Sequence, residues 1–499
     1  MSKRIYLFLL ILFNIKCMEV PDRLKNICPK GCKSYFYCNE KEKKCVFKGF
    51  FPLYPLELIE LFVLMVSSSL ATSCGIGGGI VYSSMILGIE ELEPSQAFPI
   101  SNFLILLCGF VTFISFTLDK YQHPKSLFIH YDVATIFAPS MLVGAKFGTI
   151  LNKILPSILL LILLFFLVCF TTRKTYYNIL KAKAREAKLN EKEKLLEYNN
   201  DNNKDIKAQE SSNNQKIMNS IITKEEEISQ DEIEFSRFSK IGEEDLSSLD
   251  NKSVLEETEI QKLLNEDDDP LNWERINYIL FLELIVIIDQ LCEGTSRVPS
   301  FIGIKRCSFS FWLCFIIYVI ITLYFVKVSI NKVYIHIHRK KKVFPNFKSE
   351  VIDKIEKNTI FVVLVAILAG IVSSSLGLGG GMITNPLFAS LGMEPKQSST
   401  TSNFLIIVTA VASSFIFILS GQLEIGYSIC LGIFCTVAAL IGSFYILKYI
   451  NRTGKSSILL VIMEYFLVIS LLISLHKLIT FDLKGHTFIE SLFIINKFC

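Results

Sequence analysis

The sequence predicts an all-α, polytopic membrane protein built from two related sets of helices. About half of the 499 residues are hydrophobic, and the mean hydropathy of the chain is +0.45. Leu, Ile and Phe gather in runs of roughly 16–22 residues, the length that an α-helix needs to cross the hydrocarbon core of a bilayer. Because backbone groups in lipid must be satisfied within their own segment, these runs are expected to be helices. The sequence SNFLI occurs at both 101–105 and 402–406, which indicates an internal repeat.

Residues 1–17 are predicted to be a secretory signal peptide, because Lys3 and Arg4 precede an apolar stretch too short to span a membrane. The alternative is a first spanning helix. The next segment, 18–54, is polar and favours the signal peptide. It carries four cysteines without the paired spacing of a zinc site, which are expected to form two disulfides in an extracellular or lumenal segment: Cys28, Cys32, Cys38 and Cys45. Three pairings remain open, and the protein is expected in a membrane of the secretory pathway.

The remainder of the chain divides into a first membrane set at 55–172, a second at 358–475, and the segments around them. Between the sets lie an acidic, largely disordered loop at 173–275, a linking helix pair at 276–328 and a basic loop at 329–357. Residues 476–499 form a C-terminal tail. The positive-inside rule places both loops in the cytoplasm, because the first opens with six Lys and Arg residues and the second contains HRKKK.

This orientation makes 55–89 begin and end on the outer face and 360–391 begin and end on the inner face. Each segment is therefore predicted to turn back within the membrane at its glycine cluster, CGIGGGI at 74–80 or LGLGGGM at 376–382. Three spanning helices follow each hairpin, so the two sets have opposite orientations. Inverted-repeat transporters show this pattern, and their broken helices meet at a central site. The alternative is that the glycines only allow close helix packing.

The glycine clusters and Ser-Asn pairs resemble the sulfite exporter TauE/SafE family of membrane anion permeases. The first set contributes Gly75, Gly77, Gly78, Gly79, Gln96, Ser101 and Asn102, and the second contributes Gly377, Gly379, Gly380, Gly381, Gln397, Ser402 and Asn403. The second set also has Pro386 where the family often has proline, whereas the first has Ser84. The long insert between the sets is similar to the eukaryotic branch. The resemblance implies transport of sulfite, organosulfonates or related small anions.

The glycine motif suits anion binding on physical grounds. A glycine run leaves backbone N–H groups uncovered, and the helix that restarts after it directs its positive end at a ligand. Hydroxyl and amide side chains nearby would add hydrogen bonds, although each hydroxyl taken alone can instead bond within its own helix. The predicted substrate-binding residues are Ser73, Gly75, Gly77, Gly78, Gly79, Ser101, Asn102, Ser375, Gly377, Gly379, Gly380, Gly381, Thr384, Ser402 and Asn403.

Ionisable residues inside apolar segments mark functional sites or buried pairs, since a charge in the bilayer is costly. Glu464 lies in the middle of LLVIMEYFLVI and is predicted to act in proton coupling or in a structural ion pair. Lys146 lies near a helix end, where snorkelling to the interface explains it. Cys292 and Cys307 flank the outer link between the middle helices and are predicted to form a disulfide.

The membrane portion has no nucleotide-binding P-loop and no clustered His or Cys ligands. The sequence therefore predicts a transporter of small anions in the lipid bilayer rather than an enzyme, with no cofactor, no metal and no nucleic-acid partner. Two rival functions remain: a non-transporting scaffold or sensor that signals through the acidic loop, and an uncoupled anion channel. The anion, the direction of transport and the oligomeric state are left open.

Overall fold

The structure is a computed structural model that describes residues 36–39, 44–47, 50, 55–74, 78–89, 92–122, 129–207, 271–295, 297–305, 308–343, 350–446 and 456–480. The predicted signal peptide, Cys28, Cys32, Gly75, Gly77 and Cys307 lie outside these residues. The chain divides into two units, one formed by Met1–Ile179 with Pro270–Cys499 and the other by Leu180–Asp269. In the second unit, the described part continues a helix as far as Lys207.

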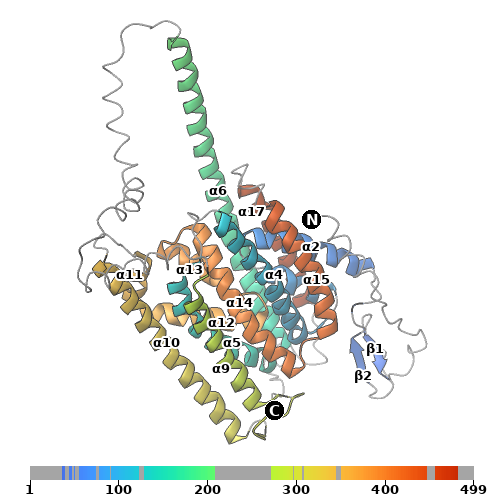
Figure 1. Cartoon of the computed structure of the whole chain (residues 1–499). Helices are drawn as coiled ribbons and strands as arrows, with labels where there is room; N and C mark the ends of the chain where they lie inside the picture. The colour runs from blue at the N-terminus through green and yellow to red at the C-terminus, as the bar shows by residue number, and fades with distance from the viewer. Residues whose placement is uncertain are drawn as a thin grey trace. The chain divides into compact units, whose positions relative to one another are not determined.

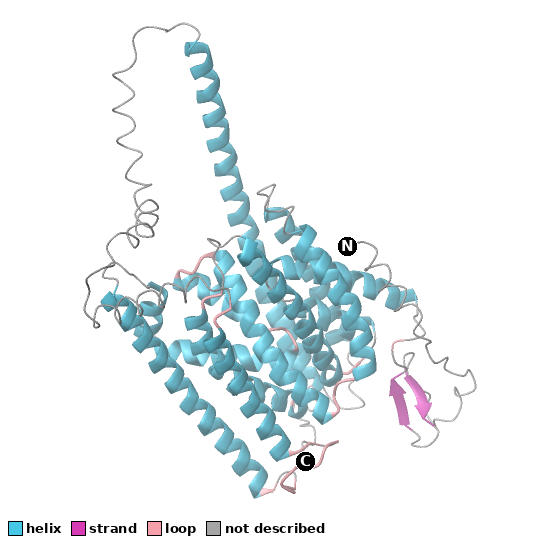
Figure 2. Ribbon diagram, in the orientation of Figure 1, coloured by secondary structure: helices cyan, strands magenta, loops and turns pink. Residues whose placement is uncertain are grey.

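The described residues are helical almost throughout, apart from one small antiparallel hairpin (Figure 2). The hairpin joins β1 (Phe36–Asn39) to β2 (Lys44–Phe47), and its register places Cys38 opposite Cys45. The first membrane set forms α2 (Pro55–Cys74), α3 (Gly79–Ile89), α4 (Pro94–Gln122), α5 (Tyr131–Ile154) and α6 (Ser157–Lys207). The link forms α9 (Trp273–Glu293), α10 (Phe309–Val343) and α11 (Glu350–Lys357). The second set forms α12 (Thr359–Leu376), α13 (Gly381–Leu391), α14 (Pro395–Ser420), α15 (Ile425–Ile441), the π-helical η2 (Gly442–Ile446) and α17 (Ser456–Ile479).

Eight of the described helices are long and apolar enough to cross a membrane. They differ in how much of their surface the rest of the protein covers. In the apolar stretch of α5, 89% of the residues are buried inside the protein, against 22% in α17. Outward faces carry large apolar side chains, as on α10, where Phe309, Ile320 and Tyr324 are exposed. Water would disfavour such a surface, whereas lipid accepts it. The prediction of a helical, multi-pass membrane protein is therefore confirmed.

The central helix of the bundle is α5, which packs most extensively against α12 and also against α9, α10 and α14 (Figure 1). Glycines allow this close approach. A side chain at Gly148 would lie 2.5 Å from the carbonyl oxygen of Ile371, and one at Gly144 or Gly370 would meet the facing backbone as well. Small residues at such crossings let two helix backbones approach closely within a membrane. The first set thus packs directly against the second.

Two expectations about the link segments need correction. The segment 329–357, expected to be a loop, is helical over most of its length, because α10 continues to Val343 and α11 follows. The acidic segment 173–275, expected to be largely disordered, is helical over most of its described part, because α6 runs to Lys207; residues 208–270 lie outside the described residues, so disorder there stays a prediction. The part of α6 beyond Leu180 lies outside the apolar stretch that is able to span a membrane, whereas α10 counts as one span as far as Val343. A polar helix is nevertheless stable where it continues a long apolar one, since no new nucleation is required.

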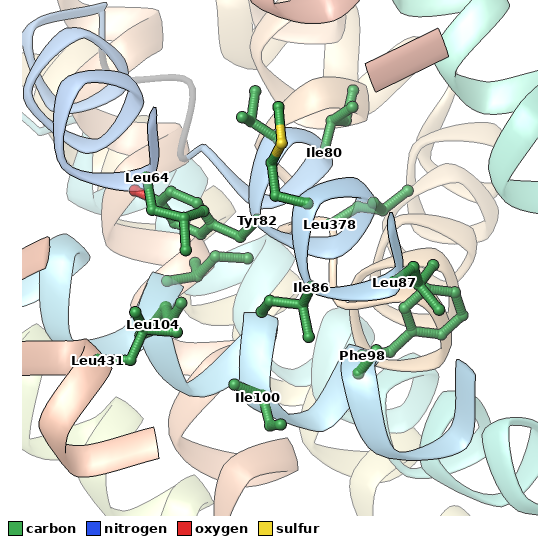
Figure 3. Close-up of a cluster of buried hydrophobic side chains, with 14 of the residues drawn as sticks. Leu64, Ile80, Tyr82, Ile86, Leu87, Phe98, Ile100, Leu104, Leu378 and Leu431 are labelled. Carbon is green, nitrogen blue, oxygen red and sulfur yellow. The ribbon is translucent and has the colours of Figure 1, made fainter. Parts of the chain in front are cut away.

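A core of buried apolar side chains surrounds the point where the sets meet. Leu378, from the second glycine cluster, lies among side chains of α3 and α4, including Ile86, Leu87 and Phe98 (Figure 3). Leu378 is 1% exposed. The second glycine cluster is therefore enclosed by the first set rather than displayed to lipid.

Candidate functional site

The second glycine cluster breaks the helix as predicted. α12 ends at Leu376, Gly377 and Gly379 adopt left-handed backbone angles with φ of 60° and 73°, and α13 begins at Gly381. Residues with a side chain avoid this conformation. The two arms are unequal. α12 has 18 residues and is long enough to span the membrane, whereas α13 has 11, which is about 16 Å and roughly half of what spanning requires.

The first glycine cluster lies against the second. A Cβ atom placed on Gly79 would lie 2.5 Å from the carbonyl oxygen of Leu378 and 2.6 Å from the Cδ1 atom of Ile105. A side chain on Gly377 would likewise meet the backbone of Phe98. Only glycine allows the two backbones to approach this closely. The structure thus brings Gly79 of the first set and Gly377 of the second to one central place.

Hydroxyl groups of the first set satisfy the carbonyl end of α12. The Ser83 hydroxyl lies 3.1 Å from the carbonyl oxygens of both Leu376 and Gly377, and Ser101 donates to Gly377 at 2.7 Å. The amide end of α13 has no such partner: in the part of the chain that the structure describes, no hydrogen bond uses the N–H groups of Gly381 or Met382. The first N–H groups of a helix lack partners within the helix. The break therefore keeps free donors while its acceptors are occupied.

The same hydroxyl contact occurs once in each set. The Ser83 and Ser101 hydroxyl oxygens lie 3.0 Å apart, and those of Thr384 and Ser402 lie 3.1 Å apart, both within hydrogen-bond distance. The members of one pair lie 301 residues from their counterparts in the other. All four side chains are fully buried. The predicted residues Ser101, Thr384 and Ser402 thus lie beside the breaks, while Ser83 takes the place in the first set that Thr384 takes in the second.

The two asparagines reach across to the opposite set. Asn102 of α4 donates through Nδ2 to Ser413 at 2.5 Å and to Ser414 at 3.3 Å, both on α14. Asn403 of α14 donates through Nδ2 to the carbonyl oxygen of Gly109 on α4 at 3.3 Å. Asn102 is thus held by two hydroxyls, whereas Asn403 makes a single long bond. The amide of Asn403 is the freer of the two to meet a ligand.

A small cavity lies at this crossing and contains residues from both sets. It has room for about one water molecule. Its lining is made by Gly78, Tyr82, Ile105, Cys108, Gly109, Thr112 and Asn403. The Tyr82 hydroxyl is held by a 2.8 Å hydrogen bond with Ser68 of α2. An anion of several heavy atoms does not fit this space, so the helices must move apart before one can enter.

Lys146 is buried and paired, so the interpretation that it snorkels to the interface is wrong. Its side chain is 2% exposed, and Nζ lies 2.7 Å from carboxylate oxygens of both Asp289 and Glu293 on α9. The sequence placed Lys146 and Asp289 in separate apolar segments but gave no sign that they meet, because 143 residues separate them. Ion pairs between distant helices leave no local pattern.

The other predicted site residues have varied outcomes. Ser375 is buried on α12, and its carbonyl oxygen accepts from Asn152 of α5 at 2.8 Å. Ser73 belongs to α2. Glu464 is on α17, and its Oε2 atom has no hydrogen-bond partner among the residues described. Cys292 is a free thiol, and since Cys307 lies outside the described residues, their disulfide stays a prediction.

Sequence reasoning missed several residues that the structure places at the site. Tyr82 and Cys108 line the cavity, and Ser413 and Ser414 hold Asn102. Cys108, Ser413 and Ser414 lie in apolar helical runs with no motif around them, whereas Tyr82 follows the first glycine cluster by two residues. The shared offset offered one usable signal, because Ser83 and Thr384 are both hydroxyl residues 301 positions apart.

These features define an integral, multi-pass helical membrane protein in which two sets of helices pack against each other at their glycine clusters. The chain belongs to the sulfite exporter TauE/SafE family, as its resemblance predicted: the family model described as "Sulfite exporter TauE/SafE" matches residues 41–174 and 301–473. "Sulfite exporter TauE/SafE family protein 1" of Arabidopsis thaliana is 22% identical over 412 residues, covering 81% of this chain and 79% of that protein. Family protein 2 of the same plant is 24% identical over 406 residues, with coverage of 79% and 77%. No solved structure matches the chain.

Proposed function

We propose that this protein transports small oxyanions, such as sulfite or an organosulfonate, and binds them between the two glycine breaks. The observation that carries the proposal is the free amide end of α13. Its first N–H groups have no described partner, while Ser83 and Ser101 occupy the carbonyl oxygens at the opposite side of the break. A helix N-terminus with free amides attracts anions through both hydrogen bonds and the helix dipole.

Thr384 and Ser402 place hydroxyl groups beside the start of α13. Thr384 bonds to Ser402 at 3.1 Å and to the carbonyl oxygen of Gly380 at 3.2 Å. Asn403 follows Ser402 on α14 and lines the central cavity with Gly78. The site needs no buried arginine, because a neutral set of donors binds an oxyanion at lower desolvation cost than a charged one. The names of the plant relatives, sulfite exporter family proteins, agree with a sulfur oxyanion as cargo.

The two membrane sets are proposed to be inverted repeats, each opened by a glycine-broken hairpin. Matched contacts in the two halves support this arrangement. The Ser83–Ser101 and Thr384–Ser402 pairs keep one spacing, and α2 packs against α15 and η2 as α12 packs against α5. A pseudo-symmetric site of this kind can open to one side or the other as one half rocks against its twin.

Counterflow in proteoliposomes tests the function. Vesicles loaded with unlabelled sulfite should take up external [³⁵S]sulfite transiently above equilibrium, as a carrier does and a channel does not. Gly380→Leu should abolish uptake, because the new side chain stands at the start of α13; its Cβ atom would lie 2.7 Å from the flexible end of Met141 and 3.4 Å from the carbonyl oxygen of Ala369. Gly426→Leu is the matched control, since no atom lies within 4 Å of a side chain there.

The absence of counterflow in the wild-type protein, with every anion of a sulfite, sulfonate and sulfate panel, would overturn the proposal. Steady flux without counterflow would instead identify an anion channel. Equal activity of Gly380→Leu and Gly426→Leu would leave transport standing but remove the α13 site. A scaffold or sensor that signals through the acidic segment would show no flux with any variant.

A further inference from the structure

The largest group of buried charges in the described helices lies where α5 meets α9, apart from the glycine breaks. Lys146 Nζ makes three short contacts there: 2.7 Å to Asp289 Oδ2, 2.7 Å to Glu293 Oε2 and 2.9 Å to Gln290 Oε1. An ammonium group has three hydrogens. All donors of Lys146 are therefore used by groups from a single stretch of α9.

The charges in this group do not balance. Lys146 alone is in direct contact with both carboxylates, so these three side chains together carry one excess negative charge when both acids are ionised, and Lys153 adds a second positive charge at the edge of the neighbouring cavity. Glu293 is 3% exposed, and its second oxygen, Oε1, is buried without a hydrogen-bond partner among the residues described. An unpaired carboxylate oxygen in such surroundings is costly. A proton on this oxygen would remove the excess charge.

A small cavity lies beside the Glu293 side chain. The space beside Lys146 and Glu293 has room for about one or two water molecules. Thr149 and Lys153 of α5 line the same space, together with Gln290 of α9 and Ile416 of α14. A water molecule there can hand a proton to the carboxylate and receive it back, as proton relays in membrane proteins require.

The titratable groups around Glu293 come from three helices. α5 contributes Lys146 and Lys153, and α9 contributes Asp289, Cys292 directly before Glu293 and, ten residues before Glu293, Glu283. α10 contributes Cys314 and Tyr318, and the Tyr318 ring lies 5.5 Å from Lys146 Nζ. α14 adds only the apolar Ile416. Among these groups, Asp289 and Glu293 are the acids in direct contact with the lysine.

A short path through α5 joins this group to the glycine break of the second set. Gly148, two residues after Lys146, packs so closely on α12 that a side chain would lie 2.5 Å from the carbonyl oxygen of Ile371. Asn152, one turn farther, donates to the carbonyl oxygen of Ser375 at 2.8 Å. Ser375 lies two residues before Gly377. A shift of α5 at Lys146 is thus transmitted to α12 through backbone contacts.

We infer that Lys146, Asp289 and Glu293 form the proton-binding site that couples anion transport to a proton gradient, an inference that rests on the proposed transport function. A hydronium ion in the cavity gives its proton to Oε1 of Glu293, leaving water and a neutral carboxylic acid, and the group changes from one negative charge to none. An anion that arrives at the breaks favours this uptake by Coulomb attraction, and reciprocally the proton favours the anion. The two then cross together.

Full-length protein in liposomes can separate coupling from transport. Counterflow of [³⁵S]sulfite at equal pH measures the anion pathway alone, because exchange needs no net proton movement. Uptake under a one-unit pH gradient, with K⁺ and valinomycin holding the membrane potential at zero, measures coupling. One proton per monovalent anion supports about a tenfold concentration ratio. Protein-free liposomes give the passive permeation to be subtracted.

Glu293→Gln keeps the shape of the side chain but cannot take up the proton. We expect its gradient-driven ratio to fall from about ten to about one, while counterflow at equal pH is retained. Glu274→Gln is the matched control on the same helix, since Glu274 is 69% exposed and bonds to the exposed Lys332 at 3.2 Å. It should accumulate the anion as the wild type does.

Each outcome decides between the two proposals. Without wild-type counterflow, the transport function fails and the coupling site with it. With counterflow but no wild-type response to the pH gradient, or with a response to a Na⁺ gradient alone, the coupling site is wrong and transport stands. The coupling site is also wrong if Glu293→Gln and Asp289→Asn both keep the full response to the pH gradient, or if Glu464→Gln alone loses that response. Should Glu293→Gln fail to fold, the wild type and Asp289→Asn still decide.

Discussion

Gly79→Ala tests the contact between the two glycine breaks with a single added carbon. The new Cβ atom would lie 2.5 Å from the Leu378 carbonyl oxygen, against at least 3.4 Å in ordinary contact, so one backbone must move by about 0.9 Å. Because the obstacle is backbone rather than a flexible side chain, rotation cannot relieve it. Overpacking of this kind costs about 1–3 kcal/mol, partly offset by the better helix propensity of alanine, which is worth up to about 1 kcal/mol.

The assay pairs thermal stability with transport. We expect the midpoint of thermal aggregation of the purified protein to fall by several degrees and sulfite counterflow to fall more steeply, because a shift of this size displaces donors at the site. Gly426→Ala is the control, since it also adds a methyl group to a helical glycine but meets no atom within 4 Å. If both variants melted together and transported equally, the breaks would not touch as described.

Three further predictions address the asparagines, the hairpin and the buried lysine. Asn403→Ala should weaken the apparent sulfite affinity in counterflow about 10–100-fold, because it removes one hydrogen bond to a charged ligand. Asn102→Ala should weaken the affinity less, because the Asn102 amide is already held by two serines. A larger loss of affinity in Asn102→Ala than in Asn403→Ala would contradict the proposed site. Mass mapping of native protein should find a disulfide between Cys38 and Cys45, because directly opposite residues of an antiparallel pair lie at a distance that a disulfide spans; a bond from either to another cysteine would refute this pairing. Lys146→Met should destabilise the protein by about 3–5 kcal/mol, because it leaves two buried carboxylates without their cation. Replacing Asp289 and Glu293 by amides in the same protein should restore much of the thermal midpoint. An unchanged midpoint in Lys146→Met would show that the ion pairs of Lys146 contribute nothing to stability.

The helices and the duplicated motif were predictable because their signals are local. Apolar length alone locates a spanning helix, and the recurrence of SNFLI fixed the offset that Ser101 and Ser402 obey. Hydropathy did not predict the helix where the helical residues are polar. An example is α10, which continues to Val343 through a basic stretch. A hydropathy threshold chosen for membrane spans places the end of such a helix where its surface becomes polar. The backbone hydrogen bonds of the helix nevertheless continue beyond that point.

The site could be predicted only as far as its motifs reach. Gly377 and Gly379 adopt the left-handed angles that a glycine run permits, and sequence reasoning identified this break. The contacts that complete the site join residues far apart in the chain, such as Ser83 with Leu376 and Asn403 with Gly109. A single sequence does not reveal such pairs, because each residue is equally compatible with its own helix whether or not the distant partner is present.

The separation of Lys146 from its partners has a consequence for biogenesis. The lysine leaves the ribosome 143 residues before Asp289, so translation at about 5–20 residues per second leaves it without a carboxylate for roughly 7–30 s. During that interval α5, which is almost wholly enclosed in the finished protein, carries an unmatched charge beside the translocon. It can settle into the bilayer only when α9 and α12 have emerged. Nascent chains that end before α9 should therefore be held by insertion factors or degraded, whatever the quality of the five helices α2–α6.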